Sequence, residues 1–180
     1  MPLPVAHSLI GASVAAAVHP KSEKWWKLLC LGAFLGVLPD FDYALNWLRV
    51  GRGGWHHGFT HSIVFALAVG AVMTVVTRSR TVRSFIAFSA ATASHGLLDY
   101  LITESRGIAL FWPFTDYRYK LRAPNPIDYT WSDASVWQAA VDILRISLIE
   151  LIIFAPLLLF VIWLRIMTSR KGKLLHGMDH

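Results

Sequence analysis

The sequence predicts an all-α, polytopic membrane protein of about five helices, and three observations lead to this prediction. Hydrophobic residues make up 55% of the 180 residues and charged residues only 16%, well to the apolar side of soluble proteins. The apolar residues also gather in runs, such as 63–77, 85–102 and 146–166, that approach or reach the roughly 20 residues needed to span a bilayer. Short clusters of Lys and Arg separate these runs. This pattern is typical of membrane topology and argues against nucleic acid as a partner, despite the net charge of +6.

One membrane-embedded domain over residues 1–180 is expected to contain five helices, at 5–18, 26–38, 61–77, 84–102 and 132–167. The first is rich in Ala, Ser and Gly, so it can pack closely against its neighbours. The second is expected to end at Pro39, and Ser132-Asp133 reads as the N-cap of the last. Residues 103–131 are expected to form a polar and aromatic loop at the membrane interface.

Three histidines, His56, His57 and His61, stand in one short segment that leads into the third apolar run. If the helix begins near Gly58 or Phe59, His61 lies in its first turn and His56 or His57 reaches it from the preceding loop. If the helix extends back to His57, then His57 and His61 stand at i, i+4 on one face. Either arrangement provides two imidazoles that can bind the same metal ion.

Other ionisable residues lie within or beside the apolar runs, where a charge without a role is costly. His95 and Asp99 stand at i, i+4 in the fourth helix, Asp40 and Asp42 follow the second, and His7 is near the start of the first. Each has a simpler reading by itself, such as a turn for the two aspartates or a core histidine. These readings, however, do not predict that the residues share one side of the membrane.

If the helices alternate in direction, all of these residues fall at the same end of the bundle. The expected metal ligands are His7, Asp40, Asp42, His56, His57, His61, His95 and Asp99. Mixed imidazole and carboxylate donors suit zinc best, with manganese or iron as alternatives, and their number fits one or two ions. Cys30 is the only cysteine, so a thiolate cluster within the chain is excluded.

The charge distribution predicts how the chain is oriented. Of the 17 Lys and Arg residues, 10 fall on the side opposite the expected ligands, together with only Glu23 and Asp179 as acids. By the positive-inside rule the ligand side faces out of the cytoplasm. On that side Arg118, Lys120 and Arg122 alternate with other residues, so an extended segment would present three cations to an anionic lipid headgroup. Alternatively, these side chains only anchor the loop by reaching lipid phosphates.

Taken together, these motifs make the chain similar to the YdjM-type family of bacterial inner-membrane proteins. They are His7, Pro39-Asp40-Phe41-Asp42, the segment from His56 to Ser62, His95 to Asp99, and Trp112-Pro113. The resemblance covers most of residues 5–115 and implies a metal-dependent hydrolase of the cytoplasmic (inner) membrane. His57 stands where the family usually has Arg, so His56 is the better match to the family's first histidine, and the path from Asp99 to Trp112 is longer. The order of ligands also resembles, more distantly, zinc-dependent phospholipases C, which would imply phosphoester hydrolysis.

We therefore expect a multi-pass hydrolase that acts on a membrane lipid, or a lipid-linked ester or phosphoester, at the outer face. A bound divalent ion lowers the pKa of a coordinated water towards about 7, and Asp40 or Asp42 is the candidate general base. The alternative is a non-enzymatic metal-binding protein, either a transporter or a structural subunit. A transporter would place its ligands near the bilayer midplane, whereas these lie at one end of the helices.

Overall fold

The computed structural model describes residues 2–19, 25–48, 56–79, 81–102, 106–121, 123, 127 and 135–176. Its five long helices are α1 (Pro4–Val18), α2 (Trp25–Val37), α4 (Ile63–Val76), α5 (Val82–Ile102) and α6 (Val136–His176). A short helix α3 (Asp42–Trp47) and two 3-10 turns, η1 (Leu38–Phe41) and η2 (Phe59–His61), complete the described elements. No strand occurs in these ranges, only an isolated bridge between Ile108 and Tyr119. The prediction of an all-α protein with about five helices is confirmed.

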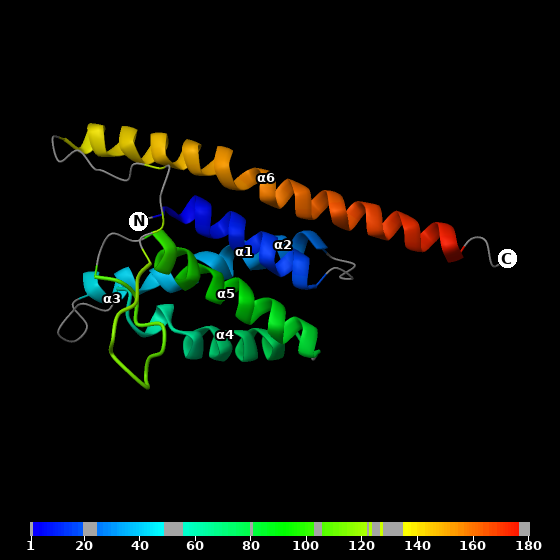
Figure 1. The fold of residues 1–180 in the computed structure, drawn as a ribbon, viewed down its shortest axis with the longest axis horizontal. Coiled ribbons are helices and arrows are strands. Elements are labelled where there is room, and N and C mark those ends of the chain that lie inside the picture. Colours follow the sequence, from blue (N-terminus) through cyan, green and yellow to red (C-terminus); the bar gives the residue numbers. More distant parts are fainter. Residues whose placement is uncertain are drawn as a thin grey trace.

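Four of the long helices form a bundle, and the fifth lies along its outside (Figure 1). α1 packs against α2, α5 and α6, while α5 also contacts α2 and α4. α3 and the loop after α5 gather at the end of the bundle where α1 begins (Figure 1). Because this end holds η1 and η2 as well, the expected ligands have a common place in the fold.

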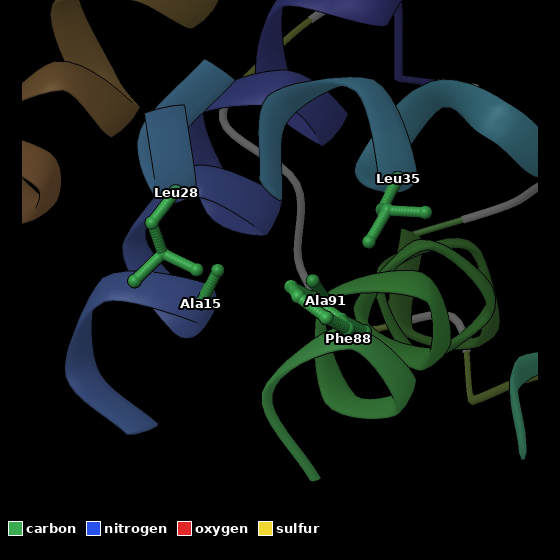
Figure 2. Packing of buried hydrophobic residues seen from close by; sticks show 5 residues of the cluster. All are labelled: Ala15, Leu28, Leu35, Phe88 and Ala91. Carbon is green, nitrogen blue, oxygen red and sulfur yellow. The ribbon is translucent and has the colours of Figure 1, made fainter. Parts of the chain in front are cut away.

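Glycines allow α1 and α2 to lie almost backbone to backbone. Gly11 of α1 faces Gly32 and Gly36 of α2, and a Cβ on any of the three would collide with main-chain or Cβ atoms of the other helix. Gly32 and Gly36 form a Gly-x-x-x-Gly pattern, which is typical of close helix pairs in membranes. We call Gly11, Gly32 and Gly36 the glycine seam. Beside it, a small apolar core fills the space between α1, α2 and α5 (Figure 2), and its members are Ala15, Leu28, Leu35, Phe88 and Ala91.

α6 is attached to the bundle by a buried carboxylate. Glu150 is 0% exposed, and its two oxygens accept the backbone N–H groups of Leu3 at 2.6 Å and Ala6 at 3.0 Å. Leu3 is the N-cap of α1 and Ala6 lies in its first turn, where the helix itself supplies no acceptor for backbone N–H groups. The side chain of the N-cap residue Leu3 cannot provide one, so Glu150 caps α1 from a neighbouring helix.

Two helices among the described residues are long and apolar enough to cross a membrane, namely α5 and the part of α6 from Val136 to Thr168. α1 and α4 are apolar but shorter. α6 as a whole has 41 residues, so it is about 60 Å long and exceeds the roughly 30 Å hydrocarbon core. Large apolar side chains such as Ile152 and Trp137 are exposed along it, which is typical of a helix that faces lipid.

Some expected helix boundaries are wrong. The last helix begins at Val136 rather than 132, because Ser135 accepts the N–H of Gln138 at 3.1 Å and is its N-cap. The same helix continues to His176 rather than 167. Residues 132 and 133 lie outside the described ranges. The second helix does end beside Pro39, at Val37, and the chain then continues at once into η1 and α3. Proline is compatible with the first turn of a helix, where its missing N–H has no partner to lose.

Candidate metal centre

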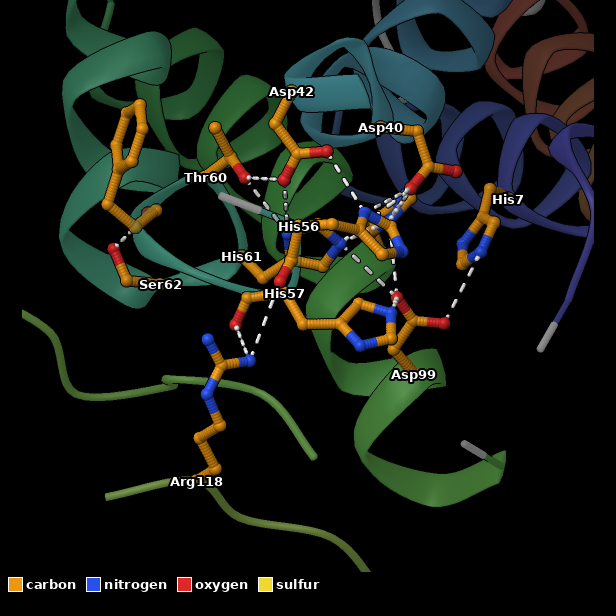
Figure 3. A network of polar contacts seen from close by, with 12 residues as sticks. His7, Asp40, Asp42, His56, His57, Thr60, His61, Ser62, Asp99 and Arg118 are labelled. Atoms are coloured by element: carbon orange, nitrogen blue, oxygen red, sulfur yellow. Dashed lines mark hydrogen bonds and ion pairs between the residues drawn. The ribbon is translucent and has the colours of Figure 1, made fainter. Parts of the chain in front are cut away.

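All eight residues expected to bind metal come together at one end of the bundle. Each of them belongs to at least one group of three whose donor atoms lie within 4.8 Å of one another. They are contributed by α1 (His7), η1 (Asp40), α3 (Asp42), the turn before η2 (His56 and His57), η2 (His61) and α5 (His95 and Asp99) (Figure 3). The described chain therefore contains histidine and aspartate groups that can hold a metal ion.

Two imidazole nitrogens lie near each other, and each lies near the same two carboxylate oxygens, at distances close to those between ligands of one ion. His95 Nε2 lies 3.1 Å from His61 Nε2 and 3.3 Å from both Asp40 Oδ1 and Asp99 Oδ2. His61 Nε2 lies 3.4 Å from Asp99 Oδ2 and 3.7 Å from Asp40 Oδ1. For tetrahedral bonds of 2.0–2.1 Å, neighbouring ligand atoms are about 3.3–3.4 Å apart. We call Asp40, His61, His95 and Asp99 the four-donor centre.

In His61 and His95, the hydrogen bond made by Nδ1 determines that Nε2 presents its lone pair to the centre. His95 Nδ1 donates to the carbonyl oxygen of Gly36 at 2.7 Å, so its Nε2 carries the lone pair when the ring is neutral. Thr60 donates its hydroxyl proton to Asp42 Oδ2 at 2.7 Å, and its oxygen lies 3.0 Å from His61 Nδ1. His61 Nδ1 can then donate to Thr60, which leaves the Nε2 lone pair directed at the same point. Both imidazoles are therefore oriented as metal ligands.

Several buried polar atoms in and beside the four-donor centre have no hydrogen-bond partner among the described residues. Both oxygens of Asp99 and Oδ1 of Asp40 are in this state, and so are both ring nitrogens of His7. Asp99 is 0% exposed and His7 only 1% exposed. A buried carboxylate without hydrogen bonds is costly unless a cation neutralises it, so the donor set fits a divalent ion.

Further histidines surround the centre and contact the same carboxylates. His7 Nε2 lies 3.6 Å from Asp99 Oδ1, and its ring stacks on that of His95 with centroids 3.7 Å apart. His57 Nε2 lies 3.6 Å from Asp99 Oδ2. On the other side, His56 Nδ1 lies 3.0 Å from Asp42 Oδ1. Because Asp99 faces His7 with one oxygen and the centre with the other, it can bridge two neighbouring ions.

The structure agrees with the first of the two sequence alternatives. His61 lies in the 3-10 helix η2, which begins at Phe59, and the rings of His56 and His57 reach it from the preceding turn. The α-helix itself begins only after Ser62, the N-cap of α4, which accepts the N–H of Phe65 at 3.1 Å. His57 has a positive φ of 60°, so it cannot stand at i, i+4 to His61 on a helix face. A left-handed backbone is uncommon for a residue with a side chain, and such residues cluster at functional sites.

Gly96 explains how η2 can lie directly against α5. A Cβ at this position would stand 2.6 Å from the carbonyl oxygen of His61. The residue next to His95 therefore has to be glycine for His61 to reach it. This requirement was not recognised from the sequence, although the pair His95-Gly96 is visible there.

The loop after α5 covers the histidine segment. The backbone N–H of Ala109 donates to the carbonyl oxygen of His57 at 3.0 Å, and Arg118 Nη1 donates to that oxygen at 3.2 Å and to the Gly107 carbonyl oxygen at 3.3 Å. Arg118 thus holds the backbone of the turn (Figure 3). Lys120 is exposed, and Arg122 lies outside the described residues.

Electrostatics around the centre favour a neutral imidazole at His57 and an ionised carboxylate at Asp40, whereas Asp40 and Asp99 raise the pKa of His61 against the effect of its burial. Burial lowers the pKa of His57 to about 4, although Asp99 opposes the shift, so this ring is neutral at pH 7. Burial works to raise the pKa of Asp40, but the imidazoles of His61 and His95 beside it hold the pKa well below its usual value. Burial and the carboxylates of Asp40 and Asp42 raise the pKa of Tyr43 to about 12, so its phenol keeps its proton.

Comparisons with known proteins agree with this picture of a membrane protein. A family model described as YdjM inner membrane protein matches residues 1–171. The inner membrane protein YbcI of Escherichia coli (strain K12) is 31% identical over 129 residues, which are 66% of this chain and 72% of YbcI. No solved structure matches the chain significantly.

Proposed function

The chain belongs to the YdjM inner membrane protein family, and we propose that it is a metal-dependent hydrolase of a lipid, or of a lipid-linked ester or phosphoester. The single observation that carries this proposal is the four-donor centre, in which the His61 and His95 nitrogens lie 3.1 Å apart and 3.3–3.7 Å from one oxygen each of Asp40 and Asp99. Two imidazoles with two carboxylates favour zinc, while manganese or iron would accept the same donors. Asp42 and His56 offer donors for a second ion beside the first.

When bound, a divalent ion polarises an ester or phosphoester oxygen and acidifies a water molecule at neutral pH. The protein's own contribution is a carboxylate that can take the proton. Asp40 turns Oδ1 towards His61 and His95, and its side chain is 12% exposed. We assign the role of general base to the remaining oxygen of Asp40, Oδ2.

Asp42 has a different role in this proposal, although the sequence offered it as an equal candidate for the base. Its side chain is 0% exposed, Oδ2 accepts the hydroxyl of Thr60, and Oδ1 lies 3.0 Å from His56 Nδ1. A carboxylate that is engaged on both oxygens is poorly placed to take a proton from water. Asp42 instead orients His61 through Thr60.

The headgroup contacts are also divided differently among the three cations of the loop. Arg118 donates to main-chain carbonyl groups, which supports a role in holding the histidine turn. We assign contact with an anionic headgroup to Lys120, which is exposed, and to Arg122, which lies outside the described residues. Guanidinium and ammonium groups bind phosphate or carboxylate oxygens by charge-assisted hydrogen bonds.

The orientation of the centre follows from charge. With 10 of the 17 Lys and Arg residues on the opposite side, the positive-inside rule supports a multi-pass arrangement whose metal centre faces out of the cytoplasm. A transporter or structural metal protein remains the rival function. The rival predicts bound metal without turnover.

Two measurements on the purified protein test the proposal. Elemental analysis should find one or two divalent ions per chain, and the double variant His61→Ala/Asp99→Ala should lose most of them. A panel of anionic and zwitterionic lipids should then show turnover by the metal-loaded protein, and Asp40→Asn should remove this turnover. Stoichiometric metal in the double variant would contradict the metal assignment, whereas bound metal without turnover of any lipid would favour the rival.

A further inference from the structure

A cavity of about 600 Å³ opens beside the metal centre between the start of α1 and the η1–α3 segment. Leu3, Val37, Phe41 and Ala44 form its apolar wall, and prolines at the start of α1 complete it. The volume falls within the 300–1,000 Å³ of typical small-molecule sites. Phe41 is 57% exposed although it lines this space, so the cavity presents a large apolar surface.

Two residues of the cavity wall also belong to the metal region. Asp40 lines the cavity and places Oδ1 3.3 Å from His95 Nε2 in the four-donor centre. Tyr43 lines the cavity too, and its ring packs on His56 with centroids 3.9 Å apart. An apolar cavity and a polar centre therefore meet at a shared wall, as a site for an amphiphilic molecule requires.

We propose that this cavity binds the hydrocarbon chain of the substrate and thereby places the attached polar group against Asp40 and the four-donor centre. This inference rests on the proposed hydrolase function and specifies its substrate as a molecule with at least one long alkyl, acyl or prenyl chain. The hydrocarbon chain of the substrate passes between α1 and α3, while the ester or phosphoester lies at Asp40. The carboxylate assigned as general base thus stands at the junction of the two parts.

The cavity selects a chain by its shape more than by its hydrophobicity. A chain that arrives from the bilayer leaves surroundings as apolar as the cavity, so transfer itself contributes little. Selection then depends on whether the chain fits between Leu3, Val37 and Phe41. Narrowing the cavity should exclude the chain without any effect on the metal ligands.

Photo-crosslinking tests the inference with a readout that does not depend on turnover. The probe is dodecyl phosphate with a diazirine at the end of its chain, applied to the metal-loaded protein in detergent and mapped by mass spectrometry. We expect labelling on Leu3, Val37 and Phe41. Ala44→Trp should abolish it by filling the cavity, and Leu3→Trp should do the same from the opposite wall.

The matched control is Ala71→Trp, because Ala71 is an exposed alanine on α4 and lies outside the cavity lining. This control should keep the labelling, and all three variants should retain metal. Label spread evenly over exposed side chains of α6, or unchanged labelling in both cavity variants, would overturn the inference and leave the hydrolase proposal standing. Specific labelling of a protein that binds no metal would support the binding of a hydrocarbon chain in the cavity and would contradict the hydrolase proposal.

Discussion

Replacing Glu150 by Ala should destabilise the protein more than any other single truncation on α6. The substitution removes both acceptors for the backbone N–H groups of Leu3 and Ala6. Two such groups left unpaired cost about 2–6 kcal/mol at about 1–3 kcal/mol each. Hydrogen bonds measured within a membrane protein average about 0.6 and reach about 1.7 kcal/mol, so two of them contribute at most about 3.4 kcal/mol. The ranges overlap at about 2–3 kcal/mol, which is the loss we expect.

Glu150→Gln keeps one acceptor oxygen and should cost about half as much, because the amide nitrogen cannot accept. The assay is reversible unfolding in mixed micelles with increasing denaturing detergent, followed by tryptophan fluorescence. Ile152→Ala is the control on the same helix, since this side chain is 73% exposed. If Glu150→Ala unfolds at the same point as Ile152→Ala, the capping of α1 by Glu150 does not stabilise the fold and the reasoning is refuted.

Three other predictions concern the centre and its orientation. Gly96→Ala should lower the bound metal, measured by elemental analysis, because its Cβ would displace the η2 carbonyl that lies 2.6 Å away, and full metal content would contradict this close approach. In a cysteine-free background, an impermeant thiol reagent should label Phe114→Cys in intact cells and not Val82→Cys, and the reverse result would invert the topology. Arg118→Gln should reduce turnover of anionic and zwitterionic lipids alike, whereas Lys120→Gln should affect the anionic lipid more, and equal small losses for both lipids with Lys120→Gln would assign that residue to membrane anchoring.

The convergence of the ligands was predictable, because helices that alternate in direction bring their successive ends to the same side. His7 and Asp99 meet in this way although 92 positions separate them. The local geometry was less accessible. Thr60 and Ser62 are both good N-cap residues, and only the packing of η2 against α5 decides that Ser62 caps α4 while Thr60 orients His61.

Contacts between distant segments explain what the sequence could not reveal. The alternation of Arg118, Lys120 and Arg122 predicted three equivalent cations, but Arg118 donates to carbonyl groups of a turn 61 positions earlier in the chain. Nothing in the local pattern distinguishes it from its neighbours. The sequence around Glu150 likewise gives no sign of its role, because its partners lie at the start of α1.

The glycine seam links helix spacing to the tautomer of His95, a candidate metal ligand. The carbonyl oxygen that fixes the tautomer of His95 belongs to Gly36, and Gly36 also touches the main chain of α1 at His7. A single methyl group at Gly36 would therefore push α1 away and carry His7 with it. It would also shift the acceptor that holds His95. The separation of the two main chains and the orientation of the imidazoles are therefore coupled. Gly36, which binds no metal, determines how the rings of His7 and His95 are placed.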